Sequence, residues 1–313
     1  MPSVIQASPR RAQLIDTRAL MQIRSLELRA RIIAQGFWSG IHRSPYHGFS
    51  AEFTEYRQYS PGDDPRYLDW RLYARSDRYY IKKFEDETNL SCHLLLDQSR
   101  SMSYGSLDWT KADYAHTLAA TLAYFLFQQG DAVGLLSFEE NVRDYLPARN
   151  RPGHLRQLML SLEKPTAGKS TDLTKPLQRI VELVSKRGLM VLVSDLLAPV
   201  EELENQIAQL TASGHEVIVI RILDPREVDF DFEDALLFHD AETEKDFFID
   251  PGAARKKYLQ RFEEHGSVVL SLCRKLGAQF LSVTTDQPLE RVLSDFLRQR
   301  QSRGKTIRRR ENR

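Results

Sequence analysis

The sequence predicts an α/β protein built on a mostly parallel, Rossmann-like sheet that is flanked by helices. Between residues 90 and 298, short apolar runs typical of buried strands alternate with longer helical patterns. The links between them are short and polar, which favours right-handed crossovers between parallel strands. Two of the apolar runs lead into the aspartates Asp97 and Asp195. Ligands of an open parallel sheet bind beyond the carboxyl ends of its strands, so these two loops are candidates for a functional site.

The chain before residue 90 lacks this alternation. Residues 1–17 show no clear period, and we expect them to be loose. Apolar residues at helical spacing over residues 19–33 predict an amphipathic helix that packs one face on the core and ends at Gly36. We expect residues 18–87 as a whole to pack on the main domain, which comprises residues 88–300.

The predicted core elements follow in order. A helix at residues 112–127 is apolar almost all round, which indicates burial on more than one side, and Gly130 ends it. Residues 132–138 form the next predicted strand, and residues 142–146 alternate as an antiparallel edge strand does. The other predicted strands are residues 189–193, 216–223 and 279–283, and the other predicted helices are residues 152–162, 174–186, 201–212, 258–276 and 289–298.

Two segments depart from the alternation. Residues 224–251 are acidic and aromatic, and short apolar runs at residues 235–240 and 245–249 predict a β-hairpin insertion. Its aromatic side chains either turn inward or form a partner-binding surface, and the sequence favours neither. Residues 298–313 hold eight basic residues and one acidic residue. We expect residues 301–313 to be a basic, disordered tail.

Composition narrows the class of protein. Hydrophobic residues make up 42% of the 313 residues, which is enough for a globular core. No apolar run approaches the ~20 residues that span a bilayer, and the N-terminus lacks the pattern of a signal peptide. Cys92 and Cys273 fall in a predicted strand and a predicted helix, where we expect buried small hydrophobes. These features predict a cytoplasmic protein.

The first candidate site is the segment Asp97-Gln98-Ser99-Arg100-Ser101. A strand that runs directly into Asp-x-Ser-x-Ser places a carboxylate and two hydroxyls on one short loop. Hard divalent cations such as Mg2+ prefer oxygen ligands of this kind. The same pattern also occurs as a polar turn that caps the next helix, because Asp and Ser are favoured there.

Two further loops favour a metal site over a cap. Thr171 precedes a helical pattern, and Asp195 ends the second apolar run. The order Asp-x-Ser-x-Ser, then Thr, then a strand-terminal Asp resembles the metal-ion-dependent adhesion site of von Willebrand factor A domains. That resemblance implies that Ser99, Ser101 and Thr171 reach Mg2+ or Mn2+ directly. It also implies that Asp97 and Asp195 act directly or through water.

A second candidate cluster lies in residues 40–87, where arginines, aspartates and aromatics surround Pro61-Gly62, a sequence that suits a type II turn. The aspartates could be acid–base or metal groups of a catalytic centre. They could equally pair with the arginines in a structural network, and the similar numbers of Arg and Asp favour this second interpretation. The predicted members of the network are Arg57, Asp63, Asp64, Arg66, Asp69 and Arg75.

The same region carries a family resemblance. From Ser44 onward the chain contains the motifs Pro61-Gly62-Asp63-Asp64, Asp69-Trp70, Ala74-Arg75 and Asp97-Gln98-Ser99-Arg100-Ser101-Met102. Together they resemble the bacterial domain-of-unknown-function 58 family over about residues 36–300. That family carries a von Willebrand A-like domain and is often linked to MoxR-type AAA+ ATPases. Many of its members begin with transmembrane helices, whereas this sequence shows no such apolar run at its start, so we do not expect a membrane-tethered role.

These observations predict a divalent-metal-dependent protein-binding module, an adaptor- or chaperone-like partner of a MoxR-type AAA+ ATPase. An open position on the cation would take an acidic residue of the partner. Nucleotide-binding glycine loops, zinc-ligand spacings and a serine nucleophile elbow are absent from the sequence. We therefore expect no catalytic residue and no enzyme activity. The alternatives are a Mg2+-dependent phosphoester hydrolase at the same site and nucleic-acid binding by the basic tail.

Overall fold

The computed structural model describes residues 16–42, 55–58, 73, 75, 78–83, 90–165, 174–184, 186–231, 236–239, 246–249 and 251–298. The chain divides into two compact units, one of residues 1–40 with 90–313 and one of residues 41–89. In the smaller unit, β1 (Glu55–Gln58) pairs antiparallel with β2 (Tyr80–Lys83). The larger unit holds the main sheet and the predicted metal loops.

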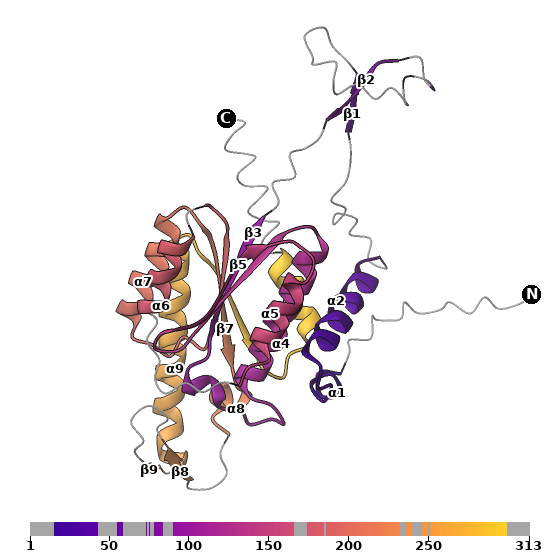
Figure 1. Cartoon of the computed structure of the whole chain (residues 1–313). Coiled ribbons are helices and arrows are strands. Elements are labelled where there is room, and N and C mark those ends of the chain that lie inside the picture. The colour runs from indigo at the N-terminus through magenta and orange to yellow at the C-terminus, as the bar shows by residue number, and fades with distance from the viewer. Residues whose placement is uncertain are drawn as a thin grey trace, which may run out of the picture. The chain divides into compact units, whose positions relative to one another are not determined.

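The larger unit is built on a six-stranded sheet with the order β10-β7-β6-β3-β4-β5 (Figure 1). Every neighbouring pair is parallel except β4 and β5, which confirms the predicted antiparallel edge. All residues of the central strand β6 are buried, as in a strand that helices cover on both faces. The bounds are β3 (Ser91–Asp97), β4 (Ala132–Phe138), β5 (Val142–Arg149), β6 (Leu189–Ser194), β7 (Glu216–Leu223) and β10 (Gln279–Thr284).

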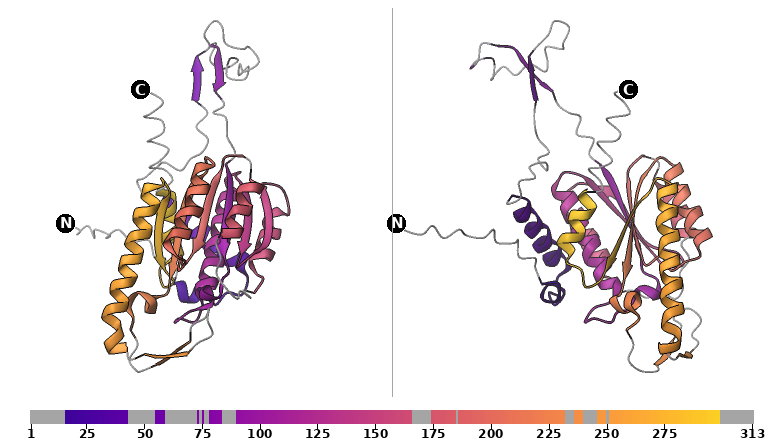
Figure 2. Two further views of the ribbon diagram at one scale, coloured as in Figure 1. Left: turned by 90° about the vertical axis from the view of Figure 1, so that its left-hand side faces the viewer. Right: turned by 180° about the vertical axis from the view of Figure 1, so that it is seen from behind.

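Helices cover both faces of the sheet (Figure 2). One face carries α6 (Thr174–Leu183), α7 (Val200–Ala212) and α9 (Pro251–Lys275). The other face carries α4 (Lys111–Gln128), α5 (His154–Leu162) and a helix at residues 289–298. This three-layer arrangement around a mostly parallel sheet confirms the predicted von Willebrand A-like fold.

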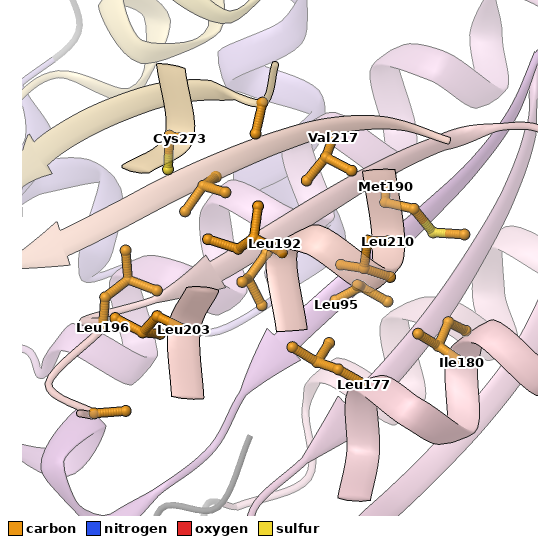
Figure 3. Close-up of a cluster of buried hydrophobic side chains, with 14 of the residues drawn as sticks. Leu95, Leu177, Ile180, Met190, Leu192, Leu196, Leu203, Leu210, Val217 and Cys273 are labelled. Carbon is orange, nitrogen blue, oxygen red and sulfur yellow. The ribbon is translucent and has the colours of Figure 1, made fainter. Parts of the chain in front are cut away.

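A cluster of buried apolar side chains joins the sheet to α6, α7 and α9 (Figure 3). Fully burying a Leu or Ile side chain contributes about 1.5–3 kcal/mol, so this cluster fixes the strands whose ends form the candidate site. Cys92 and Cys273 are both buried, as predicted, and no disulfide joins them. The labelled members in Figure 3 are Leu95, Leu177, Ile180, Met190, Leu192, Leu196, Leu203, Leu210, Val217 and Cys273.

The N-terminal helix that was expected at residues 19–33 is two helices, α1 (Thr17–Met21) and α2 (Leu26–His42). Ser25 causes the break, because its Oγ accepts a hydrogen bond at 3.3 Å from the backbone amide of Leu28 and starts a new helix. Gly36, which was expected to end the helix, lies inside α2.

Helix α2 belongs to the same compact unit as the sheet and packs on α4. The ring centroids of Phe37 and Trp38 lie 5.7 Å and 5.4 Å from that of Phe125. Leu26 and Ile33 on the same helix are buried. The predicted core-facing stripe of the N-terminal helix therefore covers the outer side of α4.

The predicted hairpin is present as β8 (Leu236–His239) and β9 (Asp246–Ile249), which pair antiparallel. A short helix that the sequence analysis did not predict, α8 (Pro225–Asp229), precedes it. Helix α9 starts at Pro251 rather than at Tyr258, because proline is well accommodated in a first helical turn. Residues 1–15 of the N-terminal segment that was predicted to be loose, and all of the predicted tail, lie outside the described residues.

Candidate functional site at the carboxyl ends of β3 and β6

The carboxylate of Asp97 lies where β3 ends, beside the end of β6. The two strands pair in parallel with Leu96 opposite Val193, so the next residues, Asp97 and Ser194, meet. Ser194 Oγ donates a hydrogen bond to Asp97 Oδ2 at 2.6 Å, and the amide of Ser99 donates to Oδ1 at 2.8 Å. Both oxygens of this buried carboxylate are therefore held in place by neutral donors.

The two serine hydroxyls of the loop point to one position. Ser99 Oγ and Ser101 Oγ are 3.1 Å apart. Two neighbouring ligands of an octahedral Mg2+, each about 2.1 Å from the ion, lie about 3 Å apart. Ser99 is fully buried and Ser101 is half-buried. The spacing and the donor chemistry of this loop therefore fit a small divalent cation.

The charge on Asp97 is poorly compensated. Burial raises the pKa of Asp97 to about 6, and the negative charge of Asp195 acts in the same direction. The hydrogen bonds from Ser194 and Ser99 oppose the rise without cancelling it. A buried carboxylate in this state is stabilised by a neighbouring cation.

Gln98 fixes the loop from the other side. Its amide nitrogen lies 3.2 Å from His116 Nε2, and its Oε1 accepts a hydrogen bond from Arg143 at 3.2 Å. Burial lowers the pKa of His116 to about 4, with Arg143 and Arg29 acting in the same direction and Asp113 against it. The imidazole is therefore neutral, and its Nε2 can accept the hydrogen bond from Gln98.

Asp195 has a different environment from Asp97. It is fully buried, and its Oδ2 accepts a hydrogen bond from Lys111 Nζ at 2.9 Å. The amide of Leu197 donates to Oδ1 at 3.3 Å. Between them, Leu196 has a φ of 56°, a left-handed conformation that non-glycine residues rarely adopt. This turn directs the chain away from the sheet directly after Asp195.

Lys111 and Glu227 belong to the site, although the sequence analysis did not select them. Lys111 Nζ also donates to Glu227 Oε1 at 2.6 Å. Burial alone would lower the pKa of Lys111, but the charges of Asp195 and Glu227 outweigh it and the pKa is raised. The missed signal was a lysine in the first turn of an apolar helix, where the helix dipole disfavours a cation. Ser194 was missed because it reads as the last residue of a buried strand.

Some of the predicted site residues cannot be placed. Thr171 lies outside the described residues, and so do four members of the predicted arginine–aspartate network, Asp63, Asp64, Arg66 and Asp69. Arg57 lies in β1 and Arg75 is exposed. The network and the Thr171 ligand stay predictions. Within the described ranges, no three His, Cys, Asp or Glu side chains gather as a metal-binding group.

Comparison with known proteins identifies the family. Residues 55–268, more than half of the chain, match the family model described as "Protein of unknown function DUF58". The chain belongs to the DUF58 family. This confirms the resemblance found in the sequence motifs. Over the described part of this DUF58 protein, no helix combines the length and the apolar character that crossing a bilayer requires.

Several proteins resemble this DUF58 chain along most of its length. An uncharacterized protein of Mycobacterium tuberculosis is 29% identical over 292 residues, which are 91% of this chain and 91% of that protein. The solved structure of an aerotolerance-related membrane protein from Bacteroides fragilis has a TM-score of 0.47 at 14% identity, covering 66% of this chain and 97% of that one. The structure of BatB from Bacteroides thetaiotaomicron has a TM-score of 0.46 at 11% identity, covering 67% and 98%.

Proposed function

We propose that this protein is a divalent-cation-dependent protein-binding module, in which a carboxylate of the partner completes the coordination of the ion. The observation that carries the proposal is the buried, poorly compensated Asp97 beside the Ser99–Ser101 hydroxyl pair, whose oxygens are 3.1 Å apart. The von Willebrand A-like fold supports a protein-interaction role. Thr171 is the proposed additional ligand, and Mg2+ or Mn2+ would supply an electrophilic position for an acidic side chain.

Binding explains this geometry better than hydrolysis. In a Mg2+-dependent phosphoester hydrolase the ion would activate a water molecule, and an accessible carboxylate would assist by accepting its proton. The two aspartates at the strand ends instead accept hydrogen bonds from Ser99, Ser194, Lys111 and Leu197. Half-buried Ser101 offers the side on which a partner could approach.

The proposed partner is a MoxR-type AAA+ ATPase with an exposed Asp or Glu, and the proposed location is the cytoplasm. The ATPase follows from the DUF58 resemblance, and the acidic side chain follows from the chemistry of a cation held by hydroxyls. Replacing that Asp or Glu of the partner by Asn or Gln should abolish binding. The loss should be as complete as the loss seen when chelator removes the ion from this protein.

Calorimetry with Mg2+ and Mn2+, followed by pull-down of the ATPase with and without chelator, tests the proposal. Ser99→Ala and Thr171→Ala should weaken binding about tenfold or more, which is ~1.4 kcal/mol. Ser103→Ala is the matched control, because Ser103 lies on the same loop but is exposed. Unchanged metal affinity in Asp97→Ala would refute the metal site. Mg2+-dependent phosphoester turnover that Asp97→Ala abolishes would replace binding by hydrolysis.

A further inference from the structure

The ammonium of Lys111 lies inside the carboxyl edge of the sheet, between carboxylates from two different elements. The side chain is fully buried, and Nζ is 2.9 Å from Asp195 Oδ2 and 2.6 Å from Glu227 Oε1. Asp195 directly follows β6, and Glu227 lies in α8, which follows β7. Nζ also lies 6.0 Å from the ring centroid of Tyr104. A single positive charge therefore joins two loops at the strand ends.

This position is unfavourable for a lysine in isolation. The positive end of the α4 dipole repels a cation, and burial removes the hydration of the ammonium. The two carboxylates offset these costs. A hydrophobic side chain at position 111 would avoid both the repulsion by the helix dipole and the loss of hydration. We therefore attribute the presence of a lysine here to the negative charges of Asp195 and Glu227, which it balances.

The two aspartates of the predicted metal site therefore differ in how their charge is balanced. Asp195 has the ammonium of Lys111, whereas Asp97 receives its hydrogen bonds from neutral groups, the amide of Ser99 and the hydroxyl of Ser194. Among the described residues, the donors to Asp97 are neutral, so a divalent ion gains more from the Asp97 side than from the side of Asp195.

Lys111 also connects the serine loop to the segments that follow β6 and β7. Its backbone amide donates to the carbonyl of Tyr104 at 2.8 Å, at the end of the loop that carries Ser99 and Ser101. Glu227 is anchored in turn, because its backbone carbonyl accepts a hydrogen bond from Tyr258 OH at 3.0 Å. The ion pair thus holds the loops of the site in one arrangement.

We propose that the Lys111 ammonium is a built-in cation of this centre, which occupies the position between Asp195 and Glu227 that a metal ion would otherwise take. Divalent ions are thereby restricted to the Asp97 side. The restriction of divalent ions to the Asp97 side rests on the metal site proposed above. The role of Lys111 as the cation between Asp195 and Glu227 does not depend on that site. When residue 111 is neutral, a carboxylate oxygen of buried Asp195 and one of partly buried Glu227 face one position, and Ca2+ or Mg2+ is the kind of ion that such oxygens bind.

The test is the melting temperature of the full chain with Lys111→Met, measured in chelator and in increasing Mg2+ or Ca2+. We expect the variant to melt below the wild type in chelator. Saturating cation should raise its melting temperature by about 5 °C or more beyond the rise seen for the wild type. Lysine with a purely structural role would give the same loss of stability with and without the ion.

Two variants serve as controls. Lys275→Met removes a cation that pairs with Glu204 at 2.8 Å, away from the loops of the site, and should create no new cation response. Lys111→Met combined with Glu227→Gln removes one of the two carboxylates, and the gained response should disappear.

Lys111→Gln, whose amide can still donate one hydrogen bond, is measured in the same way in case the methionine variant loses its fold. Absence of a gained cation response in both variants overturns the proposal, because the ion should replace the missing ammonium. A wild type that binds no Mg2+ in calorimetry, together with a lysine variant that does, would support the built-in cation while refuting the metal site at Asp97.

Discussion

At the scale of single residues, the carboxyl edge of the sheet separates two aspartates that look alike in the sequence. Each follows an apolar strand, yet Asp97 is held by neutral donors and Asp195 by an ammonium. Ser194 contributes to this difference, because its hydroxyl donates to Asp97 and accepts from the amide of Leu196 at 3.0 Å. The buried hydroxyl of Ser194 thus forms hydrogen bonds with both the Asp97 carboxylate and the backbone amide of Leu196, the residue with a positive φ.

Ser194→Ala should lower the free energy of unfolding by about 1–3 kcal/mol, because it leaves a buried carboxylate oxygen and a buried amide without that partner. The control is Ser137→Ala on β4, which is also fully buried but whose Oγ has no hydrogen-bond partner among the described residues. Urea denaturation of both variants measures the difference. Equal losses in the free energy of unfolding would show that the hydrogen bonds of Ser194 add nothing to stability beyond the packing of its side chain.

His93 should make the protein sensitive to mild acid. Burial, and next the charge of His215, lowers the pKa of His93 from 6.5 to about 4 in the folded chain. As the pH falls below 6.5, His93 is protonated in the unfolded chain before it is protonated in the folded chain. The free energy of unfolding is therefore unaffected by His93 above pH 6.5 and decreases as the pH falls towards 4. The loss could reach about 3 kcal/mol. Unfolding measured between pH 7 and 4.5 should show a smaller loss in His93→Leu, and parallel curves for the two proteins would contradict this.

At the scale of elements, the sequence predicts what burial and local pattern determine. Strands β3 and β6 were predictable because a strand covered on both faces is mostly apolar, and the β8–β9 hairpin because two short apolar runs flank a polar link. The break between α1 and α2 was missed because the apolar spacing continues across the Ser25 cap. The Lys111–Glu227 pair joins residues 116 positions apart, and no local pattern indicates such a contact.

The contact between α2 and α4 gives a prediction at this scale. Phe37 is only 8% exposed and meets Phe125 edge to face, so Phe37→Ala should cost about 3 kcal/mol through the cavity that it leaves. Leu160→Ala on α5 is the control, because that side chain is 56% exposed and should cost about 0.5 kcal/mol or less. Chemical denaturation compares the two. A loss for Phe37→Ala no larger than the control would mean that α2 is not held by this contact.

At the scale of the whole molecule, the unit that carries the site is discontinuous in sequence. Residues 1–40 and 90–313 form one compact unit, and residues 41–89 between them form another. The buried face of α2 includes Leu26, Ala30 and Ile33, each at most 1% exposed. A chain that started at residue 90 would keep every strand of the main sheet and would lose this cover.

Two shortened chains should therefore differ strongly in stability. One starts at residue 90, and the other keeps α2 but replaces residues 43–88 with a flexible linker of about 20 residues, which reaches about 25 Å on average. We expect the first to lose at least about 3 kcal/mol more than the second, because it exposes the buried face of α4 to water.

The sequence prediction that residues 18–87 pack on the main domain adds that the linker variant should itself melt below the wild type. Denaturation of the three proteins decides both points: equal stability of the two shortened chains would contradict the role of α2, and equal stability of the linker variant and the wild type would contradict the packing of the intervening segment.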